Sequence, residues 1–328
     1  NNDLTYEKKH ELNFGVDLGF LNNRINFTFD IYTRRNYDLI GATNTMGVGG
    51  ETTKYGNVAK MKSNGVELSL NTVNIKTKDF TWTTDFIYSH MHNEVTELNT
   101  LNRLYDYISG YGFTMPGYPQ RSLFSIPFAG LNNEGLPTFY DPDGNITVTG
   151  IDMQEYDPER LKFLKYEGPA DPTDVGSLGN IFRYKNLTLN LFITYSFGNV
   201  VRLDPVFSSE YSDLTATPKE FNNRWIKPGD EKFTNIPVIA SRQQLNNIAY
   251  LSRAYQSYNY STARVAKGDF IRMKEISLAY EFPKTLTQPL HLSNLSLKLQ
   301  ATNLFLLYAD KKLNGQDPTQ AGFSSINM

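Results

Sequence analysis

The stretch ELNFGVDLGFLNNRINFTFDIY, residues 11–32, alternates apolar and polar side chains on both sides of a short turn. Before the turn the apolar residues occupy even positions from Leu12 to Phe20, and after it they occupy odd positions from Ile25 to Ile31. A period of two residues is typical of a strand with one apolar and one polar face. Two such runs joined by a tight turn predict an antiparallel hairpin.

The same alternation returns in three more pairs of runs further along the chain. The runs are residues 66–71 and 80–88, residues 179–184 and 187–197, and residues 276–282 and 295–299. The sequence therefore predicts an all-β fold with about eight antiparallel strands.

The connections between the predicted hairpins are far longer than the turns within them. They span residues 39–62, 93–175 and 203–268. Loops of this length are uncommon in compact domains and are usually functional when they occur. Short turns at one end and long loops at the other are typical of transmembrane β-barrels, whose long loops are extracellular.

Aromatic residues on the apolar parity give a second indication of a membrane-spanning wall. Phe20, Phe80, Trp82, Tyr184 and Phe282 all lie next to predicted short turns. Aromatic rings prefer the interface between lipid and water, so a periplasmic belt is expected here. Alternation alone fits a soluble β-sandwich equally well, and the unequal loops and the belt favour the barrel.

Charged side chains fall on the opposite parity of the strands. They are Asp17, Asp30, Glu67, Asp85, Glu275, Glu281 and Lys298. Because charges are costly in lipid, these residues are expected to face a water-filled lumen. A closed eight-stranded barrel has an interior that side chains fill. We therefore expect an arc of a wider barrel, with further polypeptide paired to both free strand edges.

Composition excludes several classes of function. The formal net charge is −2 at pH 7, and no basic stripe could follow a phosphate backbone, so nucleic acid is not an expected partner. The chain has no cysteine, which excludes disulfides and thiol chemistry. No phosphate-binding glycine loop, nucleophile elbow or zinc-protease motif is present, so we predict no catalytic residue and no cofactor.

Two segments resemble parts of metal sites. His90 and His92 share a strand face, but no third ligand is evident. The segment DPDGN, residues 141–145, resembles the opening of a calcium loop, although Asp152 stands where glutamate closes such loops. We predict no metal at either place and interpret residues 141–145 as a turn.

The long loops are rich in tyrosine, whose ring and hydroxyl suit contacts with sugars, peptides and protein partners. Packing of the loops against each other would use the same side chains. The candidate substrate or partner contacts are Tyr105, Tyr107, Tyr111, Tyr118, Tyr255, Tyr258 and Tyr260.

Short motifs along nearly the whole chain resemble those of the SusC/RagA group of TonB-dependent transporters. Their order and spacing carry the resemblance, although Gln316 stands where an aromatic residue is expected. The motifs are SNGVE at 63–67, AGL at 129–131, GLP at 135–137, GSLGN at 176–180, RW at 224–225, PGD at 228–230, DFIRMKEISL at 269–278, ATNLF at 301–305 and NGQDP at 314–318.

The resemblance implies that residues 1–328 are the C-terminal portion of a plugged barrel of roughly 22 strands, without the plug domain and the final strand. It implies a multi-pass outer-membrane protein, in contact with lipid, that imports oligosaccharides or peptides. The implied partners are a SusD-like surface lipoprotein and TonB, which would contact an upstream region.

Two alternatives remain open from the residues alone. A surface β-sandwich adhesin or glycan-binding module would be soluble without detergent and would lack an apolar belt. An outer-membrane enzyme would need catalytic side chains in close contact. The expectation from the sequence is a transport protein that is not an enzyme.

Overall fold

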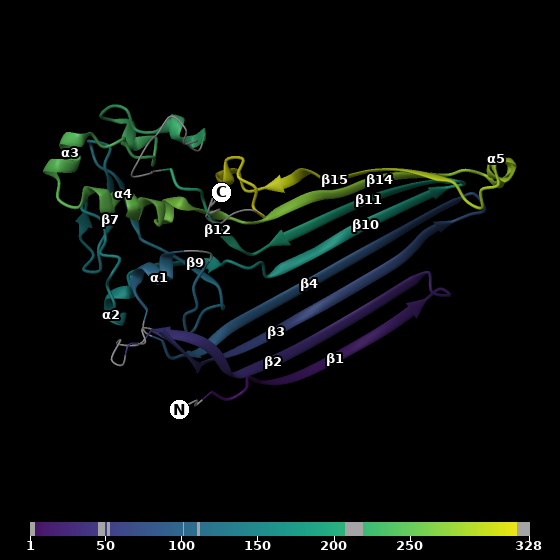
Figure 1. Cartoon of the computed structure of the whole chain (residues 1–328), viewed down its shortest axis with the longest axis horizontal. Coiled ribbons are helices and arrows are strands. Elements are labelled where there is room, and N and C mark those ends of the chain that lie inside the picture. The colour runs from purple at the N-terminus through teal and green to yellow at the C-terminus, as the bar shows by residue number, and fades with distance from the viewer. Residues whose placement is uncertain are drawn as a thin grey trace.

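Eight antiparallel strands form one sheet in the computed structural model, which describes residues 4–44, 50, 53–100, 102–109, 112–206 and 219–319. The sheet order is β1-β2-β3-β4-β10-β11-β14-β15. The bounds are β1 Lys8–Phe20, β2 Ile25–Asn44, β3 Thr53–Lys76, β4 Phe80–Leu98, β10 Asp174–Tyr184, β11 Leu187–Phe197, β14 Phe270–Glu281 and β15 Ser296–Ala309. The long connections gather at one end of the sheet (Figure 1).

The four predicted hairpins are confirmed by the strand pairing. Directly opposite residues share a face of the sheet, so the alternation within each strand continues across its neighbours. One apolar row crosses all eight strands through Leu18, Phe27, Leu70, Phe86, Leu178, Ile193, Met273 and Phe305.

This apolar face is uncovered. Phe14 on β1 is 63% exposed and Leu299 on β15 is 65% exposed. A β-sandwich would bury such a face against a second sheet, and among the described residues the sheets outside the eight-stranded one contain only two or three short strands each. The sandwich alternative is therefore wrong, and the strands form one wall with an uncovered apolar face, as in a transmembrane β-barrel.

The predicted charged residues all lie on the face opposite the apolar rows. Asp30 is directly opposite Glu67, and Asp17 accepts a hydrogen bond of 2.7 Å from the Thr28 hydroxyl. Glu275 accepts a bond of 3.3 Å from the Asn190 amide. That this polar face lines a wet lumen stays a prediction.

The sheet is open within the described residues. β1 and β15 stand at its two ends and do not pair with each other. A small closed barrel is thereby excluded for this part of the chain, and the need for further strands at both edges stays a prediction.

The prediction of a loop over residues 39–62 is wrong for residues 39–44 and 53–62, which belong to β2 and β3. β2 and β3 remain paired through this range, as far as Asn44 opposite Thr53. The ladder is irregular around Leu39, and Asp38 adopts a positive φ of 55°. An irregularity shifts the phase of the alternation, so the period of two is lost from the sequence although the strands continue.

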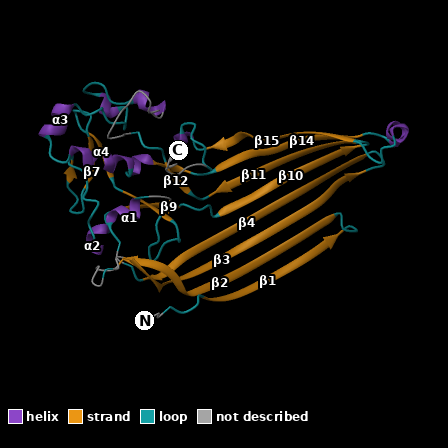
Figure 2. Cartoon of the chain, viewed as in Figure 1, coloured by secondary structure: helices purple, strands orange, loops and turns teal. Residues whose placement is uncertain are grey.

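The other end of the sheet also departs from prediction in one connection. Between β14 and β15 the chain forms α5, Lys284–Thr287, and η4, Gln288–Leu290, rather than a tight turn. Figure 2 shows this short helix beyond the ends of the strands. The helices among the described residues are all too short to cross a membrane.

The two long connections, between β4 and β10 and between β11 and β14, form a second region that we call the loop lobe (Figure 1). The first connection contains α1 Leu104–Ile108, β5 Ser122–Ser125, β6 Phe128–Leu131, β7 Pro137–Tyr140, β8 Ile146–Thr147, α2 Pro158–Leu161 and β9 Lys165–Pro169. The second contains β12 Val200–Arg202, η1 Lys219–Asn223, η2 Asp230–Lys232, α3 Arg242–Asn247, α4 Leu251–Asn259, η3 Thr262–Arg264 and β13 Val265–Lys267. A last short helix after β15 is η5, Lys311–Leu313.

Candidate functional site

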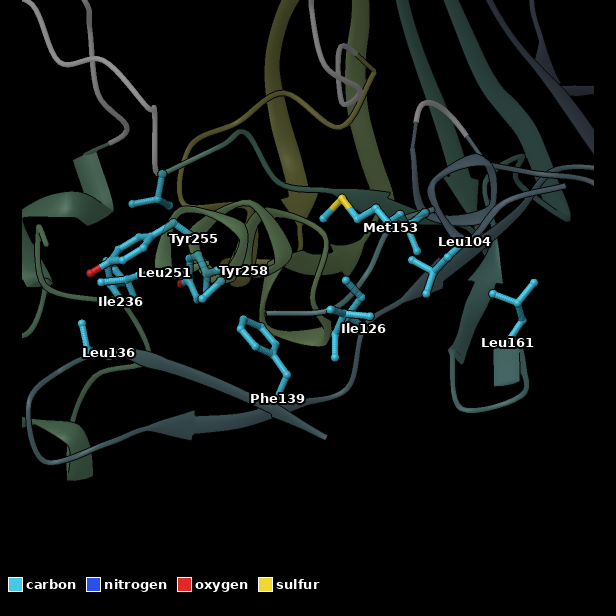
Figure 3. Packing of buried hydrophobic residues seen from close by; sticks show 14 residues of the cluster. Leu104, Ile126, Leu136, Phe139, Met153, Leu161, Ile236, Leu251, Tyr255 and Tyr258 are labelled. Atoms are coloured by element: carbon cyan, nitrogen blue, oxygen red, sulfur yellow. The ribbon is translucent and has the colours of Figure 1, made fainter. Parts of the chain in front are cut away.

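Both connections contribute to one buried core in the loop lobe. Helix α4 places Leu251, Tyr255 and Tyr258 on one face, because residues three and four apart lie side by side on a helix. Phe139 of β7 packs in the same cluster and is fully buried. Figure 3 shows its ring pointing toward this helix. The two connections therefore fold together as one unit rather than as two separate loops.

Arg202 on β12 ties the two connections together with its guanidinium. The side chain is 97% buried, since only 3% of it is exposed. One terminal nitrogen donates to the Ser125 hydroxyl at 3.2 Å and the Ser261 carbonyl at 3.4 Å, and the other donates to the carbonyls of Phe124 at 2.6 Å and Ile108 at 3.4 Å. Burial lowers the pKa of Arg202 to about 10, so the group is still charged at neutral pH.

Arg264 is a second buried arginine at the base of the lobe. Its guanidinium lies 2.5 Å from a Glu220 carboxylate oxygen and donates to the Asp204 carbonyl at 2.5 Å. It also lies over the ring of Tyr258, 5.9 Å from the centroid. Burial raises the pKa of Tyr258 to about 12, so this phenol is neutral and acts in packing.

The segment after β15 is attached to the same base. Gln316 accepts a hydrogen bond of 3.0 Å from the Asp204 amide and donates one of 3.5 Å to the Arg202 carbonyl. Asp317 pairs with Arg272 of β14 at 2.6 Å. A side-chain amide thus replaces the aromatic residue expected at position 316 by pairing with the backbone beside β12.

Two motifs far apart in the sequence meet on the outside of the core. The indole of Trp225 lies against Gly135, where an added Cβ atom would come within 2.4 Å of the ring. Gly135 also has a φ of 75°, so a larger residue would be strained as well as crowded. The Trp225 indole donates to Glu231 at 3.0 Å. This contact joins the GLP motif of the first connection to the RW motif of the second.

An aromatic pocket lies on the first connection and is the candidate contact site. Its cavity of about 90 Å³ is lined by Tyr107, Met115, Tyr118, Phe124, Leu161, Lys162 and Leu164. The Tyr118 ring is 5.2 Å from Phe124 and 4.7 Å from Tyr166, centroid to centroid. Half-buried aromatic rings around a small cavity suit an apolar side chain or the face of a sugar.

The six predicted tyrosines that the structure describes separate into three groups, of which Tyr255 and Tyr258 form the third. Tyr107 and Tyr118 meet at the aromatic pocket, and Tyr105 packs edge-on against Tyr260 with centroids 6.0 Å apart. Tyr111 lies outside the described residues.

For Tyr255 and Tyr258 the prediction of ligand contact is wrong in this structure. Each is only 1% exposed, and the Tyr255 hydroxyl donates to the Val238 carbonyl at 2.5 Å. The packing role that the sequence left open applies to both. Their positions on one helix face could have indicated it, whereas nothing in the sequence marks Arg202 or Arg264 as buried.

The segments with metal-like spacing have other partners. His90 lies 2.8 Å from Asp174, which also accepts a bond of 2.7 Å from Tyr88. Asp141 accepts bonds from the backbone amides of Asp143 and Asn145, which makes residues 141–145 a side-chain-stabilised turn. Within the described residues no group of three or more acidic or histidine side chains could hold a metal ion.

Comparison with known proteins gives relatives of one kind. No protein-family model matches the chain. It is 26% identical to "TonB-dependent receptor P3" of Formosa agariphila over 100% of this chain and 32% of that protein. It is 26% identical to "TonB-dependent receptor SusC" of Bacteroides thetaiotaomicron over 86% of this chain and 27% of that protein. The chain thus spans about a third of the length of these curated relatives.

Solved structures share the fold. The structure of the RagAB peptide transporter matches 98% of this chain and 33% of its own, with a TM-score of 0.70 and 23% identity. The "open-open" state of the RagAB peptide importer matches equally well, with a TM-score of 0.70. The names of the relatives are those of receptors and transporters rather than enzymes. The chain is therefore similar to TonB-dependent receptors of the SusC/RagA type, and its strands form the wall of an outer-membrane β-barrel.

Proposed function

We propose that residues 1–328 are the C-terminal portion of an importer of oligosaccharides or peptides. In this proposal the eight strands form part of a wide, plugged barrel, and TonB supplies energy through regions outside this chain. The loop lobe lies at the extracellular mouth, where it meets the substrate and a SusD-like lipoprotein. The observation that carries the proposal is the joining of a lipid-facing wall to a single packed lobe at its long-loop end.

The lobe suits ligand recognition because its base is held by a packed core, while its cavities are accessible to a ligand. The core and the two buried arginines fix the backbone at the base. The aromatic pocket and a wider groove of about 300 Å³ are both lined in part by residues 113–120. Half of the groove lining comes from the extended β2–β3 ribbon, including Ile40, Val58 and Lys60. Pockets of mixed polarity are usual at ligand sites.

Uptake by the full-length transporter tests the proposal. Cells that produce the Tyr118→Ala variant are expected to take up a labelled ligand about tenfold more slowly, which corresponds to the loss of about 1.4 kcal/mol of binding. Tryptic peptides and maltooligosaccharides serve as two separate probes. Tyr140→Ala, which changes an exposed aromatic residue outside the pocket, is the matched control.

The outcomes separate the parts of the proposal. Loss of uptake with one probe class identifies the substrate class, and loss of uptake on removal of TonB supports energised import. Equal uptake by both variants, at equal amounts in the outer membrane, would remove the aromatic pocket from the site. Uptake that does not depend on TonB would overturn the transport proposal itself.

A further inference from the structure

An apolar groove lies on the outward face of the wall, away from the loop lobe. Its volume is about 330 Å³, and it crosses the first four strands of the sheet. The side chains that line it on this face are Leu12, Phe14, Ile31, Thr33, Asn64, Val66 and His90.

Strand register explains both the face and the depression. One row on the lipid-facing side of the sheet runs across β1 to β4. Each of its residues is directly opposite the next: Phe14, Ile31, Val66 and His90. In the next row, the small side chains of Thr33 and Asn64 follow the larger Leu12. Small residues among large ones leave a hollow that neighbouring side chains cannot close.

Counting residues from the short turns places Arg35 at the extracellular edge of the lipid-facing band, with the groove beneath it. A tilted strand crosses the hydrocarbon core with about 10 residues. Ten residues from the turn lie His10 on β1, counted from Phe20, and Arg35 on β2, counted from Ile25. On β4, His90 lies ten residues after Phe80. Phe14 and Ile31 lie only six residues from the same turn, so the groove extends from within the hydrocarbon core on β1 and β2 to the level where lipid headgroups begin on β4.

A row of three basic side chains and one acidic side chain lies immediately above the groove on the same face. His10, Arg35, Lys62 and Glu94 are directly opposite one another across the four strands. Lys62 pairs with Glu94 at 2.9 Å. Arg35 is exposed and makes no ion pair or hydrogen bond within the part of the chain that the structure describes. One guanidinium is thus left to meet an anion from outside.

We propose that this groove and Arg35 bind a phosphate-bearing lipid of the outer leaflet. One acyl chain lies along Phe14, Ile31 and Val66, and the phosphate accepts hydrogen bonds from the Arg35 guanidinium. Arginine presents paired donors that match phosphate oxygens. A soluble anion would gain nothing from the apolar hollow, and a neutral lipid would gain nothing from Arg35. The combination therefore fits an amphiphile with a charged head.

Native mass spectrometry of the full-length transporter in detergent tests the assignment. The probes are lipid A with its phosphates, lipid A from which the phosphates have been removed, and inorganic phosphate. The phosphorylated lipid is expected to bind about fivefold more tightly than the dephosphorylated one, the equivalent of about 1 kcal/mol for one interfacial cation. Inorganic phosphate is expected to bind no more to the wild type than to the variants.

Three variants separate this site from general affinity for the barrel surface. Arg35→Gln is expected to remove the fivefold preference, and Asn64→Phe is expected to weaken binding of both lipids by filling the hollow. Arg34→Gln makes the same charge change one residue away on the opposite face and should leave the preference intact. Equal preference in Arg35→Gln and Arg34→Gln, or equal binding of the two lipids by the wild type, would overturn the proposal.

Discussion

The wall and the loop lobe differ in how their apolar residues are kept from water. In the wall, large apolar residues such as Phe14 and Leu299 remain exposed, and lipid is the solvent that covers them. In the lobe, Phe139 and Leu251 are at most 1% exposed, as in a water-soluble domain. The wall is therefore sensitive to polarity on one face, whereas the lobe is sensitive to lost volume and to unpaired buried charge. Substitutions in the two regions should therefore have different effects, which different measurements detect.

The largest effect is expected from Phe139→Ala in the lobe. Removal of a fully buried aromatic ring leaves a cavity and costs about 3 to 5 kcal/mol. Protease should then cleave the long loops of the assembled transporter more rapidly, while the barrel keeps its resistance to unfolding by detergent and heat. Tyr140→Ala, at the next residue with 43% of its surface exposed, is the control. If the barrel lost its resistance to unfolding at the same time, the lobe and the wall would be one cooperative unit.

Leu191→Arg should damage the wall rather than the lobe. Leu191 lies in a lipid-facing row opposite Ile276, where a charge near the middle of the bilayer costs about 2 to 4 kcal/mol. Less transporter should reach the outer membrane. Asn190→Arg places the same charge on the other face, beside Glu275, and should assemble in nearly normal amounts. Equal amounts of the two variants would contradict the two-faced wall.

Arg202→Lys should loosen the lobe by about 1 to 3 kcal/mol, because a single ammonium cannot reproduce bonds to several separate acceptors. Hydrogen exchange is expected to rise at residues 122–126 and 261–264, on both connections at once. Lys165→Arg, an exchange of the two cations at an exposed position, is the control. Faster exchange on one connection alone would mean that Arg202 does not join them.

The smallest effect is expected from Asn180→Ala. Asn180 accepts hydrogen bonds from the Trp82 indole at 3.0 Å and the Thr84 hydroxyl at 2.8 Å, within the lipid-facing parity of the wall. Such bonds contribute about 1 kcal/mol in a membrane. The barrel should unfold at a slightly lower temperature in detergent, and Asn71→Ala on the opposite face provides the comparison. A large loss of assembly would show that lipid does not tolerate these donors without Asn180.

Much of the wall was predictable because its pattern is local. Strict alternation identified the four hairpins, and the register then placed every predicted charged residue on one face. Alternation does not predict the strands where the ladder is irregular. At Asp38 and Leu39 the phase changes, and the paired extension of β2 and β3 resembled a loop.

The lobe was predictable only as a region. Its length and its tyrosines indicated a functional loop, but which tyrosines are buried depends on which distant segments meet. Tyr258 faces the core because α4, from the second connection, packs against β7 of the first, whereas Tyr118 lines a pocket formed by distant segments of the first connection. No period in the sequence carries that information.

The sequence by itself determined the strands, their two faces and the unequal connections, because the period of two is a property of the extended backbone and of neighbouring residues. Tertiary structure alone decided that Arg202 joins Phe124 to Ser261 and that Trp225 rests on Gly135. It alone decided also that Thr33 and Asn64 open a hollow beneath Arg35. These arrangements arise from packing between residues far apart in the chain, and local alternation does not constrain such contacts.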